Sequence, residues 1–323
     1  MRIVMVGTGY VGLVSGACLA DFGHHVTCID KNAEKIAALQ NGEIPIYEPG
    51  LDQLIAANAT AGRLCFNLHL SESVARADAV FIAVGTPSRR GGGHADLSYV
   101  HAAAREIARA TKGFTVVITK STVPVGTGDD VERIITETNP NADIVVASNP
   151  EFLREGAAIR DFKHPDRIVV GTNDERARKV ISDIYRPLYL NQAPIMYTGR
   201  RTAELIKYAA NAFLATKIAF INEIADLAER VGADVQEVAR GIGLDNRIGS
   251  KFLHAGPGFG GSCFPKDTRA LVKTAKGLRC AATYRRSGAR GQRHPQARDG
   301  AQSLGGARRE FARQDCRGAR PHL

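Results

Sequence analysis

The chain has 323 residues, 44% of them hydrophobic, which is enough for two domains with apolar cores. Its formal net charge is +10, but residues 279–323 hold eleven arginines and three acidic residues, so residues 1–278 are nearly neutral. This distribution excludes a folded basic face for nucleic acid. The lack of any run of about eighteen apolar residues excludes a transmembrane helix.

Six cysteines are scattered along the chain without the CxxC spacing of a metal site. The N-terminus, MRIVMVGTG, also lacks the pattern of a secretory signal. Together these features favour reduced thiols in the cytoplasm, with no bound metal and no disulfide framework.

Residues 1–278 alternate strand-like apolar runs with helical patterns, which is typical of a parallel α/β sheet. The runs are short, rich in Val and Ile and almost continuously apolar, as in strands buried on both faces. We expect strands at residues 2–7, 25–30, 79–85, 115–121, 143–149, 167–172 and 194–199.

A different pattern begins at residue 200. Residues 200–231 contain neither Gly nor Pro, and their apolar positions recur at helical intervals. This predicts one long helix that links domains or forms the core of a homodimer; the alternative is two helices that break near Thr216. Residues 279–323 are rich in Arg, Ala, Gly and Gln, which predicts disorder rather than an RNA-binding arm.

The first expected strand runs into the pattern GTGYVG, which contains Gly7, Gly9 and Gly12 and precedes a helical stretch. Such glycines permit a tight turn, close approach of a pyrophosphate and close packing of the helix on the strand. Asp30 ends the next strand, where an acid accepts the ribose hydroxyls and disfavours a 2′-phosphate. We therefore expect an NAD site in a Rossmann-type sheet, although Lys31 weakens the argument against NADP. A glycine turn without a ligand is the alternative.

Thr86 and Thr122 follow two later strands, and ligands of open α/β sheets bind at the carboxyl ends of strands. Their hydroxyls either reach this cleft or belong to ordinary turns. The segment NPEFLRE, residues 149–155, offers two carboxylates and an arginine near the same cleft.

The loop GPGFGGSCFPKDT leads into a helix expected over residues 266–276. Pro265 suits its first turn, so Cys263 is expected just before the helix, beside the positive end of its dipole and near Lys266. That environment favours a nucleophilic thiolate, and Asp267 is placed to assist proton transfer. An inert buried cysteine is the alternative.

Lys207 and Asn211 are four residues apart on the expected long helix and therefore share one face. A lysine and an amide within an apolar stretch either stabilise an oxyanion or form a solvated helix edge.

Six motifs in chain order resemble the UDP-glucose 6-dehydrogenase family: GTGYVG, GTPS, KSTVPVGT, NPEFLREG, ELIKYAANAFLATKIAFINE and GPGFGGSCFPKDT. The resemblance spans residues 1–278 and implies a four-electron oxidation of the C6 alcohol of a nucleotide sugar to a carboxylate, with two NAD. The product would be a uronic-acid sugar nucleotide used for capsule or exopolysaccharide.

The resemblance implies an α/β fold: an N-terminal Rossmann-type doubly wound parallel sheet, then a long central helix and a helical dimerisation region. We assign residues 1–199 to the NAD-binding domain, 200–278 to the central helical domain with the cysteine loop, and 279–323 to an aberrant tail. The family continues into a second nucleotide-binding domain that is absent here. We therefore hypothesise a frameshift near codon 278.

The resemblance also implies residue roles. The catalytic set is Cys263 as nucleophile, Lys207 and Asn211 at the oxyanion, Asp267 for proton transfer and thioester hydrolysis, and Thr122 and Glu151 for positioning water. The cofactor set is Gly7, Gly9, Tyr10, Val11, Gly12, Asp30, Lys35, Thr86, Thr122, Glu155 and Lys266. The substrate set is Phe152, Leu153, Arg154, Glu155, Lys207, Asn211, Phe252, Leu253, His254, Ala255, Gly256 and Gly260.

Two alternatives to UDP-glucose oxidation stay open. One is a related enzyme that acts on GDP-mannose or a UDP-N-acetylated hexosamine. The other is an inactive remnant that binds NAD or only dimerises through residues 200–231.

Overall fold

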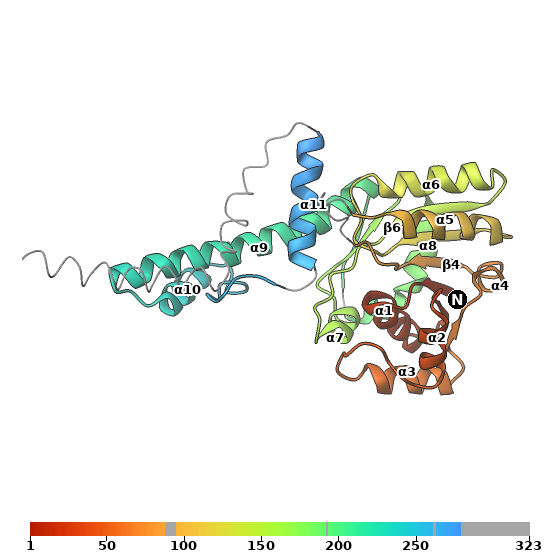
Figure 1. Ribbon diagram of the computed structural model, residues 1–323, viewed down its shortest axis with the longest axis horizontal. Helices are drawn as coiled ribbons and strands as arrows, with labels where there is room; N and C mark the ends of the chain where they lie inside the picture. Colours follow the sequence, from red (N-terminus) through yellow and green to blue (C-terminus); the bar gives the residue numbers. More distant parts are fainter. Residues whose placement is uncertain (88–94, 192, 261–262, 279–323) are drawn as a thin grey trace, which may run out of the picture. The chain divides into compact units, whose positions relative to one another are not determined.

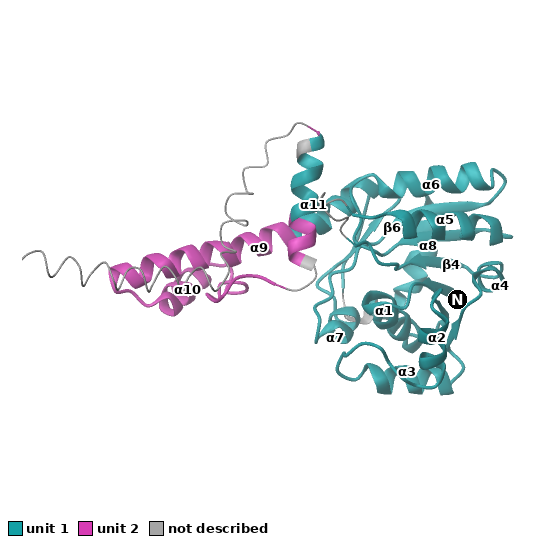
Figure 2. Ribbon diagram, in the orientation of Figure 1, with its two compact units in different colours: residues 1–210, 269–277 teal, residues 211–268, 278–323 magenta. Residues whose placement is uncertain are grey.

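The computed structural model describes residues 1–87, 95–191, 193–260 and 263–278. Residues 279–323, for which the sequence predicts disorder, lie outside the described residues. The chain divides into two compact units, residues 1–210 with 269–277, and residues 211–268 with 278–323 (Figure 2). The domain boundary expected at residue 200 stays a prediction.

The first unit contains one sheet of eight strands in the order β3-β2-β1-β4-β5-β6-β7-β8 (Figure 1). The strands are β1 Arg2–Val6, β2 His25–Ile29, β3 Leu64–Asn67, β4 Ala79–Ile82, β5 Thr115–Thr119, β6 Ile144–Ser148, β7 Ile168–Gly171 and β8 Ile195–Thr198. The strand order reverses between β1 and β4, so the sheet is doubly wound, as predicted.

Two features of this sheet differ from the prediction. The pair β6–β7 is antiparallel, whereas the other neighbouring strands are parallel. The edge strand β3 was not predicted, because its residues alternate between buried and more exposed positions and form no continuous apolar run. The seven strands that were predicted are confirmed.

Helices cover both faces of the sheet. They are α1 Tyr10–Asp21, α2 Ala33–Gln40, α3 Leu51–Thr60, α4 Leu70–Val74, α5 Ser98–Ala110, α6 Thr127–Thr138, α7 Ala158–Lys163 and α8 Glu175–Ile184. Along β1, Ile3 and Met5 pack into the core that includes α1, whereas Val4 and Val6 pack into the core that includes α5 and α6. This alternation explains why the strands are apolar on both faces.

The long helix α9, Arg200–Val231, is continuous, so the alternative of a break near Thr216 is wrong. It is followed by α10, Val235–Gly243, and α11, Cys263–Gly277. The position of Pro265 predicted that Cys263 precedes the helix. In the structure, Cys263 is instead the first residue of α11. In the second unit, Ile221, Ala239 and Leu253 form a small core.

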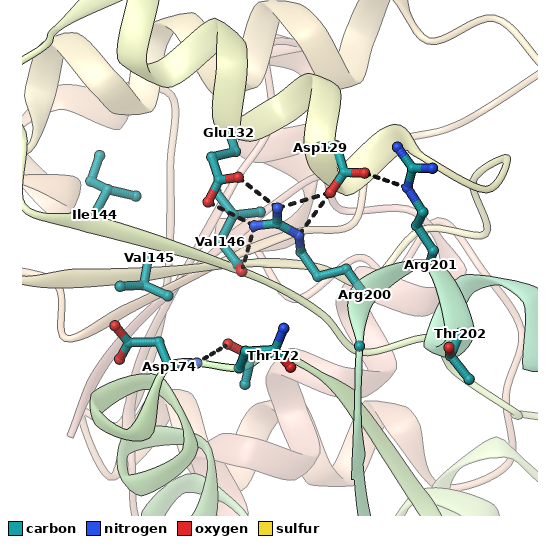
Figure 3. Close-up of a pocket in the computed structure, with 12 residues that line it drawn as sticks. Asp129, Glu132, Ile144, Val145, Val146, Thr172, Asp174, Arg200, Arg201 and Thr202 are labelled. Carbon is teal, nitrogen blue, oxygen red and sulfur yellow. Dashed lines mark hydrogen bonds and ion pairs between the residues drawn. The ribbon is translucent and has the colours of Figure 1, made fainter.

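The first turn of α9 is fastened to α6 by ion pairs (Figure 3). The Arg200 guanidinium lies 2.8 Å from an oxygen of Asp129 and 2.5 Å from an oxygen of Glu132. Arg201 also pairs with Asp129, at 2.6 Å. These side chains line a cavity of about 510 Å³ beside β6.

One turn further along α9, the buried Glu204 carboxylate accepts hydrogen bonds from Gly126 N at 2.7 Å and Gly128 N at 2.8 Å. It therefore satisfies backbone donors at the start of α6. Burial raises the pKa of Glu204, and these hydrogen bonds oppose that rise. The loop between β5 and α6, which carries Thr122, is thus tied to the helix that carries Lys207.

Candidate active site

The turn between β1 and α1 has no room for side chains at two of its glycines. Gly7 has φ +106°, and a Cβ there would lie 2.6 Å from the Ala83 carbonyl oxygen. A Cβ on Gly12 would lie 1.9 Å from the Gly7 carbonyl oxygen. A Cβ on Gly9 would meet no atom within 4 Å, so this glycine leaves an open backbone surface rather than a packed one.

The N-terminus of α1 is suited to an anion. Gly9 is the N-cap, so no side chain caps the helix, and the first turn contains no acidic residue. The first N–H groups of α1 have no partner within the helix, and the helix dipole places partial positive charge there. Phosphate groups bind at helix ends of this kind.

A cavity of about 620 Å³ opens beside this turn, at the carboxyl ends of β1, β2 and β4. It is the position where the strand order reverses and where doubly wound sheets bind ligands. Gly7 and Gly9 line it, together with residues 68–71 and one side of α5. The open backbone at Gly9, the uncapped helix and the cavity volume all fit a dinucleotide.

Asp30 lies in this cavity and is held as a carboxylate. It accepts hydrogen bonds from Thr8 Oγ1 at 2.6 Å and Asn32 N at 3.2 Å, and the Lys35 ammonium lies 3.2 Å away. Burial alone would raise the pKa of Asp30, but these hydrogen bonds and the charge of Lys35 lower it to about 2. Asp30 and Lys35 therefore meet in the cavity, as expected for members of the cofactor set.

The loops after β4 and β5 are joined by hydrogen bonds. Thr86 Oγ1 donates to the Thr122 carbonyl at 3.0 Å, and Ser121 Oγ donates to the Val84 carbonyl at 2.7 Å. The structure thus brings Thr86 and Thr122 together. The sequence predicted only that each residue follows the carboxyl end of a strand.

A buried ion pair follows β6. The Lys207 ammonium lies 3.2 Å from Glu151 Oε1 and 5.2 Å from the centre of the Phe152 ring. Only about 5–6% of either charged side chain is exposed. The other Glu151 oxygen accepts from Leu153 N at 2.6 Å, so the carboxylate is fixed in orientation. Burying two charges costs more than such a pair often returns, so the pair is weak evidence for stability, and its predicted role stays a prediction.

Lys120 is a second buried cation in the first unit and has no role in the predicted site. Its ammonium donates to Asn149 Oδ1 at 3.0 Å and to the Tyr185 hydroxyl at 3.1 Å. Burial lowers the pKa of Lys120 to about 8; the charge of Glu151 opposes this change, and that of Lys207 adds to it. The residue stands within the KSTVPVGT motif, but only the fold shows that its side chain is buried.

The end of the NPEFLREG segment lies near the surface. Arg154 and Glu155 are exposed, and Arg154 pairs with Asp161 at 2.6 Å. The buried Glu48 accepts from Gly156 N and Ala158 N, both at 2.8 Å, and from the Tyr10 hydroxyl. Glu48 therefore ties this segment to the first turn of α1. No motif pointed to Glu48.

In the second unit, Asn211 and Asp267 form a buried pair. Asn211 Nδ2 donates to Asp267 Oδ2 at 2.7 Å, and the Lys266 ammonium lies 3.7 Å from Oδ1. Asp267 is fully buried. Cys263 begins the same helix, four residues before Asp267, and the position of its side chain lies outside the described part of the structure.

The remaining members of the substrate set lie in the loop before α11. Phe252 has φ +67°, and its ring packs 6.3 Å from that of Phe264. Leu253 is buried, whereas His254, Gly256 and Gly260 are exposed. Gly256 N also donates to Asn222 Oδ1 at 2.9 Å, which holds the loop on α9.

The described residues contain neither a membrane-spanning helix nor a cluster of metal ligands. No helix in the ranges that the structure describes is long and apolar enough to cross a membrane. No group of three or more His, Cys, Asp or Glu residues in those ranges is placed to hold a metal ion.

The fold and the cavity at its strand-order reversal place the first unit among dinucleotide-binding domains. Residues 1–189 match the NAD binding domain of the UDP-glucose/GDP-mannose dehydrogenase family, and residues 201–290 match its central domain. The chain belongs to this family, as the motifs indicated. NAD is the cofactor of the matched N-terminal domain.

Individual relatives agree. The chain is 73% identical over 278 residues to the UDP-glucose 6-dehydrogenase of Rhizobium meliloti. The aligned region covers 85% of this chain and 64% of that enzyme. It is 56% identical to the enzyme YwqF of Bacillus subtilis, with coverage of 85% and 62%. The chain thus spans less than two thirds of the length of these relatives.

Solved structures give the same result. A UDP-glucose dehydrogenase from Pyrobaculum islandicum superposes with a TM-score of 0.86 at 44% identity, covering 90% of this chain and 67% of that one. A GDP-mannose dehydrogenase from Pseudomonas aeruginosa superposes with a TM-score of 0.74 at 37% identity, covering 90% and 69%.

Replacing Gly9 and Gly12 separates cofactor binding from folding. Gly9→Ala is expected to change the free energy of unfolding by less than about 1 kcal/mol, because its Cβ meets no atom, yet to weaken NADH binding at least about tenfold. Gly12→Ala is expected to destabilise the fold by more than about 2 kcal/mol, because its Cβ overlaps the Gly7 carbonyl. Urea unfolding and NADH fluorescence titration measure both. Equal effects of the two changes on stability would contradict this assignment.

Lys120 predicts a specific pH dependence of stability. Its pKa of about 8 in the fold lies below the value of about 10.4 in an unfolded chain, so the unfolded state binds more protons between these pH values. The free energy of unfolding should therefore rise with pH across this window, by roughly 3 kcal/mol, relative to a Lys120→Met variant. Urea unfolding at pH 7 and pH 10 tests this, with the exposed Lys112→Met as control. A difference that is independent of pH would show that folding does not lower the pKa of Lys120.

Proposed function

We propose that this chain carries the NAD-binding and catalytic residues of a UDP-glucose 6-dehydrogenase, which oxidises UDP-glucose to UDP-glucuronate. The observation that carries the proposal is the pair of buried polar contacts, Lys207 with Glu151 and Asn211 with Asp267. Buried ionisable groups that are fixed by one specific partner are typical of catalytic sites. All four residues stand in motifs that the family shares.

NAD supplies the hydride acceptor, used twice per sugar. The Cys263 thiolate adds to the C6 aldehyde produced by the first oxidation and gives a thiohemiacetal. The second oxidation converts this adduct to a thioester, and attack by water then releases the carboxylate and regenerates the thiol. The covalent bond retains the sugar between the two oxidations.

The other predicted catalytic residues stabilise the oxyanion, transfer a proton or orient the hydrolytic water. Lys207 and Asn211 stabilise the oxyanion at C6, for which a cation and an amide donor are suited. Asp267 moves the proton, while Glu151 and Thr122 orient the hydrolytic water. Glu151 is already fixed by Lys207 and Leu153 N, so its free lone pairs have a defined direction.

The cofactor is proposed to bind in the cavity at β1, β2 and β4. Glu155 and Lys266 stay predicted members of the cofactor set. The nucleotide sugar is proposed to bind the loop of residues 252–260 and the segment of residues 152–155. The cytoplasmic location expected from the cysteines stays a prediction.

Substrate choice favours UDP-glucose over the related sugars. The 73% identity is to a UDP-glucose 6-dehydrogenase, whereas the similar GDP-mannose and UDP-D-ManNAc dehydrogenase structures are 37% and 30% identical. The inactive remnant stays an alternative, because the chain spans only 64% of the Rhizobium meliloti enzyme.

Turnover tests the proposal. NADH formation from UDP-glucose is expected at about two NADH per sugar, and Cys263→Ala is expected to reduce the rate at least about a thousandfold. The matched control is Cys65→Ala, since Cys65 is an exposed free thiol far from these motifs in sequence. NADH binding without turnover would favour the remnant, and turnover only with GDP-mannose would identify the related enzyme.

We further propose a homodimer through α9. In the second unit, Phe213, Phe220 and Leu227 are exposed at intervals of seven residues, so they share one stripe of the helix. A second copy of the chain would cover this stripe.

The dimer predicts that Phe220→Glu produces a monomer, because a charge would be buried in the seam. Analytical ultracentrifugation measures the mass, and Leu244→Glu, an exposed position outside α9, is the control. An unmodified chain that sediments as a monomer at about 50 μM would contradict the dimer.

A further inference from the structure

The NAD cavity contains an ion pair that the family motifs do not include. The Lys31 ammonium lies 2.5 Å from Glu106 Oε1, and both residues line the cavity. Lys31 directly follows Asp30 at the end of β2, whereas Glu106 comes from α5, 75 residues further along the chain. The fold alone brings them together.

A cation beside the β2 carboxylate is the element that accommodates a 2′-phosphate in NADP-binding relatives of this fold. Lys31 therefore has the chemistry of an NADP determinant in a site that otherwise has an NAD determinant, Asp30. Lys35 does not supply this cation, because its ammonium is 3.2 Å from Asp30. The choice between NAD and NADP therefore depends on whether the Lys31 ammonium is free to bind a 2′-phosphate.

The structure assigns Glu106 as a second determinant of coenzyme choice: it pairs with Lys31 and so withholds from a 2′-phosphate the cation that would bind it. Arg109, on the next turn of α5, is the one arginine among the described residues that line the cavity. NAD has no 2′-phosphate and needs no such cation. Glu106 thus acts against NADP by neutralising Lys31.

The pair is exposed enough for salt to weaken it. The side chains of Lys31 and Glu106 are 71% and 37% exposed, so the pair contributes little to folding. A 2′-phosphate carries nearly two negative charges, so at equal distance its Coulomb attraction to a lysine is about twice that of a carboxylate. Removing the Glu106 charge should therefore change the NADPH affinity more than the stability.

The test compares the affinities of the whole chain for NADPH and NADH by nicotinamide fluorescence. Glu106→Gln keeps the size and removes the charge. It is expected to improve NADPH binding roughly three- to tenfold at low ionic strength, with NADH binding changed less than about twofold. The gain should shrink at about 0.5 M salt.

Two further variants isolate the cause. Lys31→Gln in the Glu106→Gln background should abolish the gain, whereas Lys31→Gln alone should change NADPH binding little. Glu137→Gln is the matched control, because Glu137 pairs with Arg133 at 2.9 Å on the surface of α6, away from the cavity.

The outcomes are distinct. An NADPH to NADH affinity ratio that Glu106→Gln leaves within about twofold of the unmodified value would overturn the inference. A gain that survives Lys31→Gln would also overturn it, since Lys31 would then not be the group released. Absence of NADH binding by the unmodified chain would instead contradict the NAD site itself, and the inference with it.

Discussion

The lack of side chains at Gly7 and Gly12, in the turn between β1 and α1, is the constraint on which the first unit depends. A Cβ at Gly7 would overlap Ala83 at the end of β4, and a Cβ at Gly12 would overlap Gly7 itself. The turn can therefore pack directly against the end of β4. The cavity opens beside this turn, so the same close packing that organises the fold also exposes the N-terminus of α1 to a ligand.

Charge is buried in this chain where β5 and β6 end. Lys120, Glu151, Lys207 and Glu204 are all buried, and each has a specific polar partner. For the Lys207–Glu151 pair, apolar residues of similar volume would often stabilise the fold as well. The burial of this pair is what the chemistry proposed for the site requires. Hydrogen bonds to backbone N–H groups, as at Glu204, hold the loops that carry it.

Sequence periodicity predicted the central strands and the single long helix because their residues are buried on two faces or on a regular stripe. It failed for β3, an edge strand whose pattern alternates, and it could not show that β7 runs antiparallel to β6. Motifs predicted roles for Asp30, Glu151, Lys207 and Asp267, and these roles stay predictions. The motifs could not identify Glu48, Lys120 or Glu106, because these side chains acquire their partners only through contacts between distant segments.

Titration of NADH into the whole chain, followed by nicotinamide fluorescence and by thermal unfolding, tests the central claim that the cavity beside the glycine turn is an NAD site. We predict saturable binding of one NADH per chain. We also predict an unfolding temperature that rises with NADH concentration, because the ligand binds only the folded state. Fluorescence and unfolding temperature that do not change up to about 1 mM NADH would contradict the claim.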